Sequence, residues 1–269
     1  MHWVNGTSQG CIEPYDRGLA YGDGLFATMR TGDTGILFFD CHQARLTAGA
    51  ARLGFEWGLS HELKNQLNAI AEQYPHHCIK LILTRGVGGR GYAPPAEVKV
   101  SEVVSVHPIP SHYADWQRDG ICLKTSSVRL GHQPLLAGIK HLNRLEQVLI
   151  KSQPLATGFE DWLVLDCHDK VIESSMANIF FIKGNQLSTP SLEYCGVAGV
   201  MREQVMQNLL ENGMNIECLP IQSKQLADFD SVFITNSVLG VVDVKQIDTL
   251  SFSRSPITTL LREQLSLTL

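Results

Sequence analysis

The chain has 269 residues, 44% of them hydrophobic, so it is long enough to bury one large core or two smaller ones. Lys and Arg together number 22 against 27 Asp and Glu, which gives a net charge of -5, and no long run of like charges occurs. This pattern excludes a basic nucleic-acid-binding arm and an acidic tail. We therefore expect a small-molecule partner and no nucleic acid.

The start of the chain lacks the basic and apolar segments of a signal peptide, and no apolar stretch is long enough for a membrane span. The 7 cysteines are scattered and form no Cys-x-x-Cys pair, as in a reducing compartment. We expect a cytoplasmic protein without membrane contact. His107 and His112 lack convincing metal-ligand company, so no metal is predicted.

In the first part of the chain, residues 24–30 and 35–39 are expected to be extended. Asp40 and Ser60 are each expected to cap a helix, because apolar residues at helical spacing follow them. Residues 77–84, dense in Ile and Leu, and residues 98–106 are expected to be strands. The pattern is that of an α+β fold.

Two prolines, Pro108 and Pro110, interrupt the pattern and indicate a linker. The predicted division is residues 1–107 for an N-terminal domain, 108–115 for the linker and 116–269 for a C-terminal domain. The elements expected after the linker are strands at 121–128, 162–166, 179–183 and 232–235 and helices at about 143–152 and 202–211.

Lys140 and Glu173 are the candidate reactive groups. Lys140 lies in the apolar segment Leu135–Leu142, and a lysine must be partly desolvated to attack a carbonyl at neutral pH. Glu173 precedes a strand that reads as buried, where its carboxylate could pair with a protonated pyridine nitrogen. Together they indicate pyridoxal phosphate. The alternatives are a lysine that extends its ammonium to water and a solvated turn glutamate.

A phosphate group needs donors, and three places could supply them. The glycine-containing run 196–202 leads into a helix whose first N–H groups are free to bind an anion. Arg45 could add a charge-assisted contact, and the segment Thr235-Asn236-Ser237 could add hydroxyl and amide donors. Taken singly, each could equally be a solvated arginine or an ordinary turn.

Residues 86–91 satisfy the G-x-G-x-x-G pattern and follow a predicted strand. The sequel contains Pro94 and Pro95, which cannot begin the required helix in the usual way. A dinucleotide site is therefore rejected, and the segment is interpreted as a flexible loop whose Arg90 could meet an acidic substrate.

Taken in order, several motifs resemble the class-IV, or branched-chain-type, pyridoxal-phosphate-dependent aminotransferase family over nearly the whole chain. They are residues 16–26 (DRGLAYGDGLF), 42–46 (HQARL), Lys140, 173–180 (ESSMANIF) and 199–202 (GVMR). The resemblance implies the two-domain α+β fold of fold-type-IV enzymes, with the cofactor in the interdomain cleft and a homodimer as the usual assembly.

The resemblance also implies roles by position. Lys140 would carry the cofactor and shuttle protons, and Glu173 would pair with its pyridine nitrogen. The implied cofactor-binding set is Arg45, Lys140, Glu173, Asn178, Val200, Met201, Thr235 and Asn236. Two positions depart from the family pattern: Leu145 stands where a tyrosine is common, and Met201 where a threonine is common, which leaves only a backbone contact there.

Within the family, residues 86–92 and 132–149 resemble the lyases that convert 4-amino-4-deoxychorismate to 4-aminobenzoate and pyruvate for folate synthesis. The candidate substrate contacts are Thr28, Arg30, Arg90 and Tyr92, each of which could equally have an ordinary packing role. The alternatives are an aminotransferase for D-amino or branched-chain acids, which would share every cofactor residue, and a pyridoxal-phosphate-binding protein without turnover.

Overall fold

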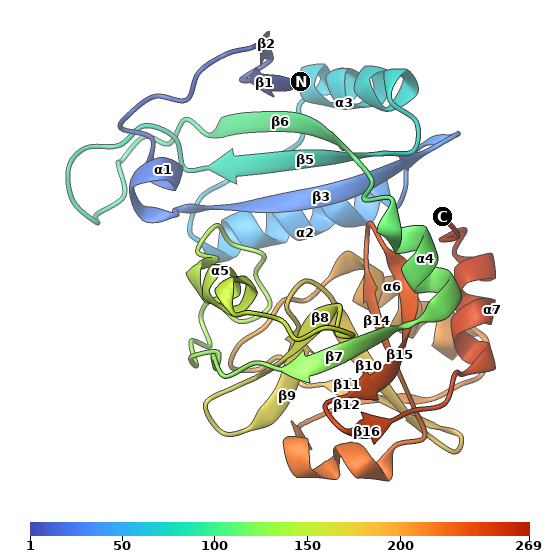
Figure 1. Cartoon of the computed structure of the whole chain (residues 1–269). Coiled ribbons are helices and arrows are strands. Elements are labelled where there is room, and N and C mark those ends of the chain that lie inside the picture. Colours follow the sequence, from blue (N-terminus) through green and yellow to red (C-terminus); the bar gives the residue numbers. More distant parts are fainter. The chain divides into compact units, whose positions relative to one another are not determined.

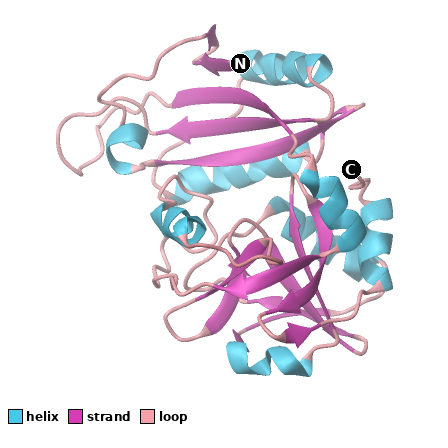
Figure 2. Ribbon diagram, in the orientation of Figure 1, coloured by secondary structure: helices cyan, strands magenta, loops and turns pink.

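The computed structural model describes all 269 residues, which form two compact units (Figures 1 and 2). The first comprises Met1–Ile109 and Ile139–Asn143, and the second comprises Pro110–Gly138 and Arg144–Leu269. Both units combine helices with a sheet, which confirms the predicted α+β class. None of the helices has the length and hydropathy needed to cross a bilayer.

The first unit is built on a six-stranded sheet in the order β2-β1-β6-β5-β3-β4, in which every pairing is antiparallel. Its elements are β1 (His2–Val4), β2 (Thr7–Ser8), α1 (Arg17–Tyr21), β3 (Gly24–Gly32), β4 (Gly35–Ile36), α2 (Phe39–Arg52), α3 (His61–Gln73), β5 (His77–Thr84) and β6 (Ser101–Pro108).

Alternation along β3 gives this sheet two different faces. Leu25, Ala27 and Met29 are buried in a core that includes Leu46 and Ala50 of α2. The residues between them point to the opposite face, because successive side chains of a strand alternate. The core therefore fixes which side chains of β3 are left for the other face.

The predicted helix starts are right for one helix and wrong for the other. The Ser60 hydroxyl accepts a hydrogen bond from the Leu63 amide at 3.1 Å and caps α3, as predicted. Asp40 does not cap α2, because the helix already begins at Phe39 and Asp40 lies in its first turn. The residue at the cap is Phe38, which has a left-handed backbone (φ 53°) and no capping side-chain hydrogen bond.

The second unit is a ten-stranded sheet with helices. Its strand order is β12-β11-β10-β14-β15-β7-β8-β9-β13, with β16 paired to β15. The strands are β7 (Ile121–Thr125), β8 (Asp161–Leu165), β9 (Lys170–Ser174), β10 (Asn178–Lys183), β11 (Gln186–Pro190), β12 (Ile216–Leu219), β13 (Ile221–Gln222), β14 (Ser231–Asn236), β15 (Gly240–Ile247) and β16 (Leu250–Ser251). The helices are α4 (His112–Asp119), α5 (Leu145–Ser152), α6 (Val200–Glu211), the 3₁₀ helix η1 (Ser223–Asp228) and α7 (Pro256–Gln264).

An additional pairing between β9 and β10 closes part of this sheet on itself. The strands β10, β14, β15, β7, β8 and β9 thus form a ring, which leaves no free edge among them. Their apolar residues are buried almost without exception, and Phe180 and Phe233 stack at 4.8 Å between ring centroids. This rigid core holds the ends of β9 and β10, where predicted site residues lie.

The division into units differs from the predicted one in two places. Ile139–Asn143 belongs to the first unit, although the predicted C-terminal domain contained it. The reason is backbone pairing, since the Phe26 amide donates to the Lys140 carbonyl at 3.0 Å and the Leu142 amide donates to the Gly24 carbonyl at 2.9 Å. Regular structure also shortens the predicted linker, because β6 includes Pro108 and α4 begins at His112.

Candidate active site

Lys140 lies on an extended segment that pairs with β3 of the first unit. The bridge between Leu25 and His141 sets the register, so Lys140 stands opposite Phe26 and on the same face of the sheet. Its Nζ atom lies 4.7 Å from the centroid of the Phe26 ring. The half-buried amine therefore has a defined position against an aromatic face.

The same face carries the predicted substrate contacts Thr28 and Arg30. They follow Phe26 at every second position of β3; Thr28 is half-buried and Arg30 is buried, with 6% exposed. Burial lowers the pKa of Arg30. Lys80, on β5 opposite Thr28, places a second ammonium 4.9 Å from the Phe26 ring. This face is consequently positively charged and suited to an acidic substrate.

Helix α2 contributes Arg45 and a buried histidine, His42. Burial lowers the pKa of Arg45 to about 10. His42 is 1% exposed and neither ring nitrogen has a hydrogen-bond partner. Burial, helped by the nearby charges of Arg45 and Lys140, lowers its pKa to about 3. A neutral imidazole thus lies near two cationic groups of the first unit.

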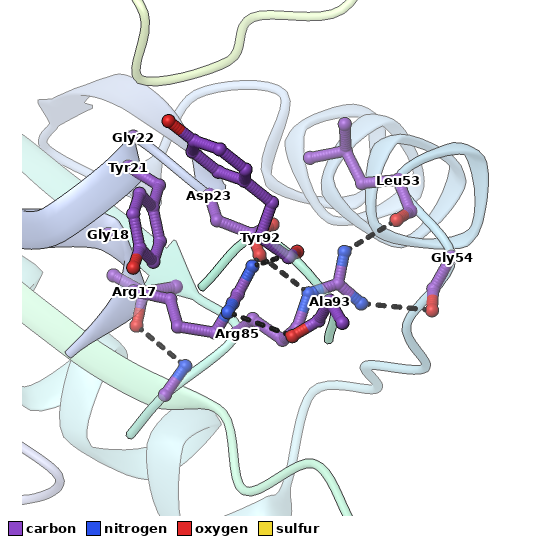
Figure 3. Close-up of polar contacts among 12 residues, drawn as sticks. Arg17, Gly18, Tyr21, Gly22, Asp23, Leu53, Gly54, Arg85, Tyr92 and Ala93 are labelled. Atoms are coloured by element: carbon purple, nitrogen blue, oxygen red, sulfur yellow. Dashed lines mark hydrogen bonds and ion pairs between the residues drawn. The ribbon is translucent and has the colours of Figure 1, made fainter. Parts of the chain in front are cut away.

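The loop that carries Arg90 and Tyr92 is held by a buried network of charges (Figure 3). The Asp23 carboxylate accepts from Nε of Arg17 at 2.8 Å and from Nε of Arg85 at 2.7 Å. Arg17 also donates to three consecutive loop carbonyls, those of Gly91, Tyr92 and Ala93, at 2.9 to 3.2 Å. Its guanidinium thus fixes the loop backbone.

Arg85 anchors the start of the loop, because it donates to the carbonyls of Leu53 and Gly54 at the end of α2. Arg90 is exposed, and the Tyr92 ring is 86% exposed and 5.4 Å from the ring of Tyr21. No helix follows residues 86–91, as Pro94 and Pro95 predict. The loop presents both predicted side chains to solvent on a fixed backbone.

In the second unit, Glu173 and Asn178 face one another across neighbouring strands. The two residues pair between β9 and β10, and both are 6% exposed. Glu173 accepts from the Val197 amide at 3.1 Å, and the Asn178 side-chain amide donates to the Val197 carbonyl at 2.7 Å. Both side chains therefore hold the turn before α6, and Arg144 is close enough for the charge of Glu173 to affect its pKa.

The turn at residues 196–199 ends at the N-terminus of α6, where Val200 and Met201 begin the helix. No side chain caps this end at Gly199, so the first N–H groups of the helix are left for an anion. A Cβ atom at residue 199 would lie 2.3 Å from the Asn178 Oδ1 atom, so any larger residue there would displace the Asn178 side chain. Val200 and Met201 themselves are buried, which restricts them to backbone contacts.

Thr235 and Asn236, the other predicted phosphate contacts, have their side chains engaged elsewhere. The Thr235 hydroxyl donates to the Gly240 carbonyl at 2.7 Å, and the Asn236 amide donates to the Met176 carbonyl at 3.1 Å. The Asn236 oxygen accepts from the amides of Val238 and Leu239. These bonds stabilise the turn after β14, and the part of Thr235 and Asn236 in phosphate binding stays a prediction.

Several residues around these groups had no role assigned from the sequence. Phe26, Lys80 and His42 surround the Lys140 segment, and the Arg17–Asp23–Arg85 network fixes the loop. The alternation of Phe26 with Thr28 along the predicted strand was the one sequence signal that could have identified Phe26. Leu145, at the position of the family tyrosine, is 76% exposed on the surface of the second unit.

Comparison with known proteins identifies the family. The model of the class IV amino-transferase family matches residues 24–247, so the chain belongs to that family. The aminodeoxychorismate lyase of Vibrio harveyi is 37% identical over 92% of this chain and 91% of its own. The crystal structure of 4-amino-4-deoxychorismate lyase from Pseudomonas aeruginosa superposes with a TM-score of 0.92 at 36% identity, covering 98% of both chains. The D-alanine aminotransferase of Bacillus licheniformis is 31% identical over 90% of this chain and 84% of its own.

Proposed function

We propose that the chain is a pyridoxal-phosphate-dependent lyase that converts 4-amino-4-deoxychorismate to 4-aminobenzoate and pyruvate. The observation that carries this proposal is the likeness to two lyases named for that substrate, at 37% and 36% identity over at least 92% of the chain. The likeness to a D-alanine aminotransferase is lower, at 31%. The alternative function is therefore a D-amino-acid or branched-chain aminotransferase.

The residues present fit pyridoxal phosphate. The uncapped N-terminus of α6 and the guanidinium of the half-buried Arg45 suit its phosphate. The buried carboxylate of Glu173 suits a protonated pyridine nitrogen, and the half-buried amine of Lys140 suits the aldehyde.

When bound, pyridoxal phosphate withdraws electrons from the carbon next to the substrate nitrogen. Nζ of Lys140 removes the proton from C4 of the substrate, and Lys140 or an ordered water returns one to the departing enolpyruvyl fragment. The atoms of the substrate divide between the two products without added water or redox change. Arg30 and Arg90 are proposed to bind its carboxylates, with Thr28 and Tyr92 beside them.

The test is to mix protein loaded with pyridoxal phosphate with enzymatically generated aminodeoxychorismate and to follow 4-aminobenzoate and pyruvate together. We expect equal amounts of the two products and a fall of at least about 10²-fold in Lys140→Ala, since a proton-transferring group is removed. Lys80→Ala is the matched control, because Lys80 contacts the same Phe26 ring and should retain the chemical step.

Four results would count against the proposal. Unequal products or an active Lys140→Ala variant would refute the assigned mechanism. Conversion of alanine or leucine to the keto acid, without 4-aminobenzoate from aminodeoxychorismate, would identify an aminotransferase. Binding of the cofactor with no reaction of either kind would indicate a protein that binds pyridoxal phosphate without turnover.

We further propose a cytoplasmic, homodimeric enzyme of folate synthesis. What supports a dimer is the apolar surface of α5, where Leu145, Val148 and Leu149 are 55% to 76% exposed. Light scattering of the purified protein should give twice the mass of one chain. A Leu149→Glu variant should shift it toward one chain.

A further inference from the structure

A second group of reactive side chains lies in the second unit, where β8 turns into β9. Cys167 and His168 are exposed on this turn, and His132 reaches it from the segment before Lys140. One ligand atom from each of the three residues lies within 4.8 Å of the others. None of the three has a part in the proposed lyase reaction.

A buried carboxylate, Asp166, organises this group. Its Oδ2 atom lies 2.8 Å from Nε2 of His132, and its Oδ1 atom accepts from the amides of His168 and Lys170, both at 2.9 Å. The same carboxylate therefore orients the His132 ring and folds the turn that carries Cys167 and His168. Because Nε2 of His132 is directed at Asp166, its Nδ1 atom is left to bind another group.

Ring contacts fix the imidazoles further. The His132 ring stacks on the Tyr194 ring with 4.9 Å between centroids and 17° between the planes. The His168 ring makes an edge-to-face contact with the His132 ring, also with 4.9 Å between centroids. His132 thus has little freedom to leave the group. This is the arrangement of a prepared ligand set, in which outer contacts orient the inner ones.

We propose that His132, Cys167 and His168 bind a divalent transition-metal ion such as zinc. One thiolate and two imidazoles are ligands that zinc and cobalt bind well. A metal-bound histidine that gives its other nitrogen to a carboxylate is the usual outer-shell arrangement. Three protein ligands leave a fourth position for water or an external ligand.

The spacing suits this type of site. At metal–ligand distances of about 2.0–2.3 Å, ligand atoms of a tetrahedral site lie roughly 3.5 Å apart. The three atoms now lie within 4.8 Å of one another, and rotation of the exposed Cys167 side chain with a small adjustment of His168 would bring them to that separation while His132 stays in place. No movement of β8 or β9 is required.

A neighbouring set, His132, Asp166 and Cys195, also lies within 4.8 Å but is the poorer site. Asp166 is 1% exposed and Cys195 is 8% exposed. Asp166 already accepts hydrogen bonds from His132, His168 and Lys170, and a metal bound there would compete with them. Breaking the hydrogen bonds of the buried Asp166 carboxylate is a cost that the outer set does not carry.

The test uses cobalt(II) as the probe on reduced, chelator-treated full-length protein, with and without pyridoxal phosphate. We expect one equivalent of cobalt to give a thiolate-to-metal absorption band that zinc abolishes by displacement. The band should be lost in Cys167→Ser, and the affinity should fall at least tenfold in His168→Gln. It should persist in Cys195→Ser and in Cys11→Ser, the control that removes an exposed cysteine elsewhere.

Thermal unfolding provides a second readout that does not depend on colour. Zinc should raise the midpoint of the wild type and leave that of Cys167→Ser unchanged, because only a native-state ligand stabilises. A band that survives in Cys167→Ser, one that disappears in Cys195→Ser, or no cobalt spectrum at all would overturn the proposal. Formation of 4-aminobenzoate is measured separately, so either proposal can fail without the other.

Discussion

Burial controls the charge of single side chains in the first unit. His42 is neutral because its ring is enclosed beside Arg45 and Lys140, and Arg45 keeps its charge although its pKa is lowered. A neutral imidazole near these two cations adds no third positive charge to the region. The electrostatic state of the Lys140 segment therefore depends in part on the protonation of His42.

This state predicts a pH dependence of stability. The pKa of His42 is about 3 in the folded chain and about 6.5 in an unfolded one. Between these values the unfolded chain binds the additional proton, so the free energy of unfolding falls as the pH is lowered from 6.5 toward 3. The contribution is fully present above 6.5 and changes by at most about 1.4 kcal/mol per pH unit.

Urea unfolding of wild type and His42→Gln at about pH 7 and about pH 5 measures this effect. The variant should lose less stability on acidification than the wild type does. His61→Gln, which changes an exposed histidine, is the control and should behave as the wild type. Equal losses in wild type and His42→Gln would show that His42 does not titrate as described.

The second residue-scale prediction concerns Glu173. In Glu173→Gln the amide keeps the size of the side chain but cannot balance a positive pyridine nitrogen, so lyase activity should fall about 10- to 100-fold, the value of one hydrogen bond to a charged group. Steady-state kinetics of 4-aminobenzoate release measure it. Glu146→Gln, on α5, removes another carboxylate that acts on Arg144 and is the matched control.

Among the elements, the ion pairs of Asp23 connect α1, the end of α2 and the loop after β5. Two buried guanidinium groups share its carboxylate, with 4% and 7% of their side chains exposed. Burial acts to raise the pKa of Asp23, but hydrogen bonds from Arg85 and Arg17 lower it overall. Its stabilisation is therefore present above the ordinary carboxyl pKa and is lost as the pH falls through the lowered value.

Asp23→Asn should lower the free energy of unfolding by about 3–5 kcal/mol, because two buried cations lose their common partner. Denaturant unfolding checks the value, and faster proteolysis between residues 86 and 95 should accompany it. The comparison variant is Asp33→Asn, whose exposed pair with His76 is worth at most about 1 kcal/mol. Equal stabilities of the two variants would contradict the assigned role of Asp23.

The sequence predicted those helices and strands whose pattern lies within a few neighbouring residues. The Ile- and Leu-rich run 77–84 is β5, and Ser60 begins α3. Short strands such as β1 and β13 escaped, because two or three residues have no usable period. Pairings between distant segments escaped as well: nothing in the Lys140 segment indicates that its backbone continues the sheet beside β3, more than 100 residues earlier.

The candidate site divides in the same way. Lys140 and Glu173 have local signals, an amine among apolar residues and a carboxylate before a buried strand. The contacts of Arg17 join residues 74 to 76 positions apart, and those of Asn178 depend on a turn formed 19 residues later. Such contacts follow from the assembled sheets and cannot be read from spacing.

For the molecule as a whole, the chain passes between the two units three times, after residues 109, 138 and 143. The segment Ile139–Asn143 is part of the first unit, although both its neighbours belong to the second. Ile139 is 4% exposed, and the segment makes two backbone hydrogen bonds with β3. The first unit is therefore incomplete without five residues from the later half of the chain.

This predicts the behaviour of fragments. Residues 1–109 alone should be less stable than the same fragment extended by a flexible linker and residues 138–144. The difference should be about 2 kcal/mol or more, from the burial of Ile139 and two backbone hydrogen bonds, less the cost of closing the loop. Urea unfolding measures it, with a Lys140-centred segment of scrambled order as the control. Equal stabilities would show that the segment adds nothing to the unit.

The pairing of residues 140–142 with β3 also limits how the sequence can change in evolution. Deleting one residue just before Lys140 would bring the His141 imidazole opposite Phe26 where the amine belongs, and inserting one would turn Lys140 to the other face. Changes of even length preserve the face, and changes outside the paired segment leave it untouched. Length variation among descendants of this gene should therefore avoid odd steps between Gly138 and Leu142, however freely the surrounding loops drift.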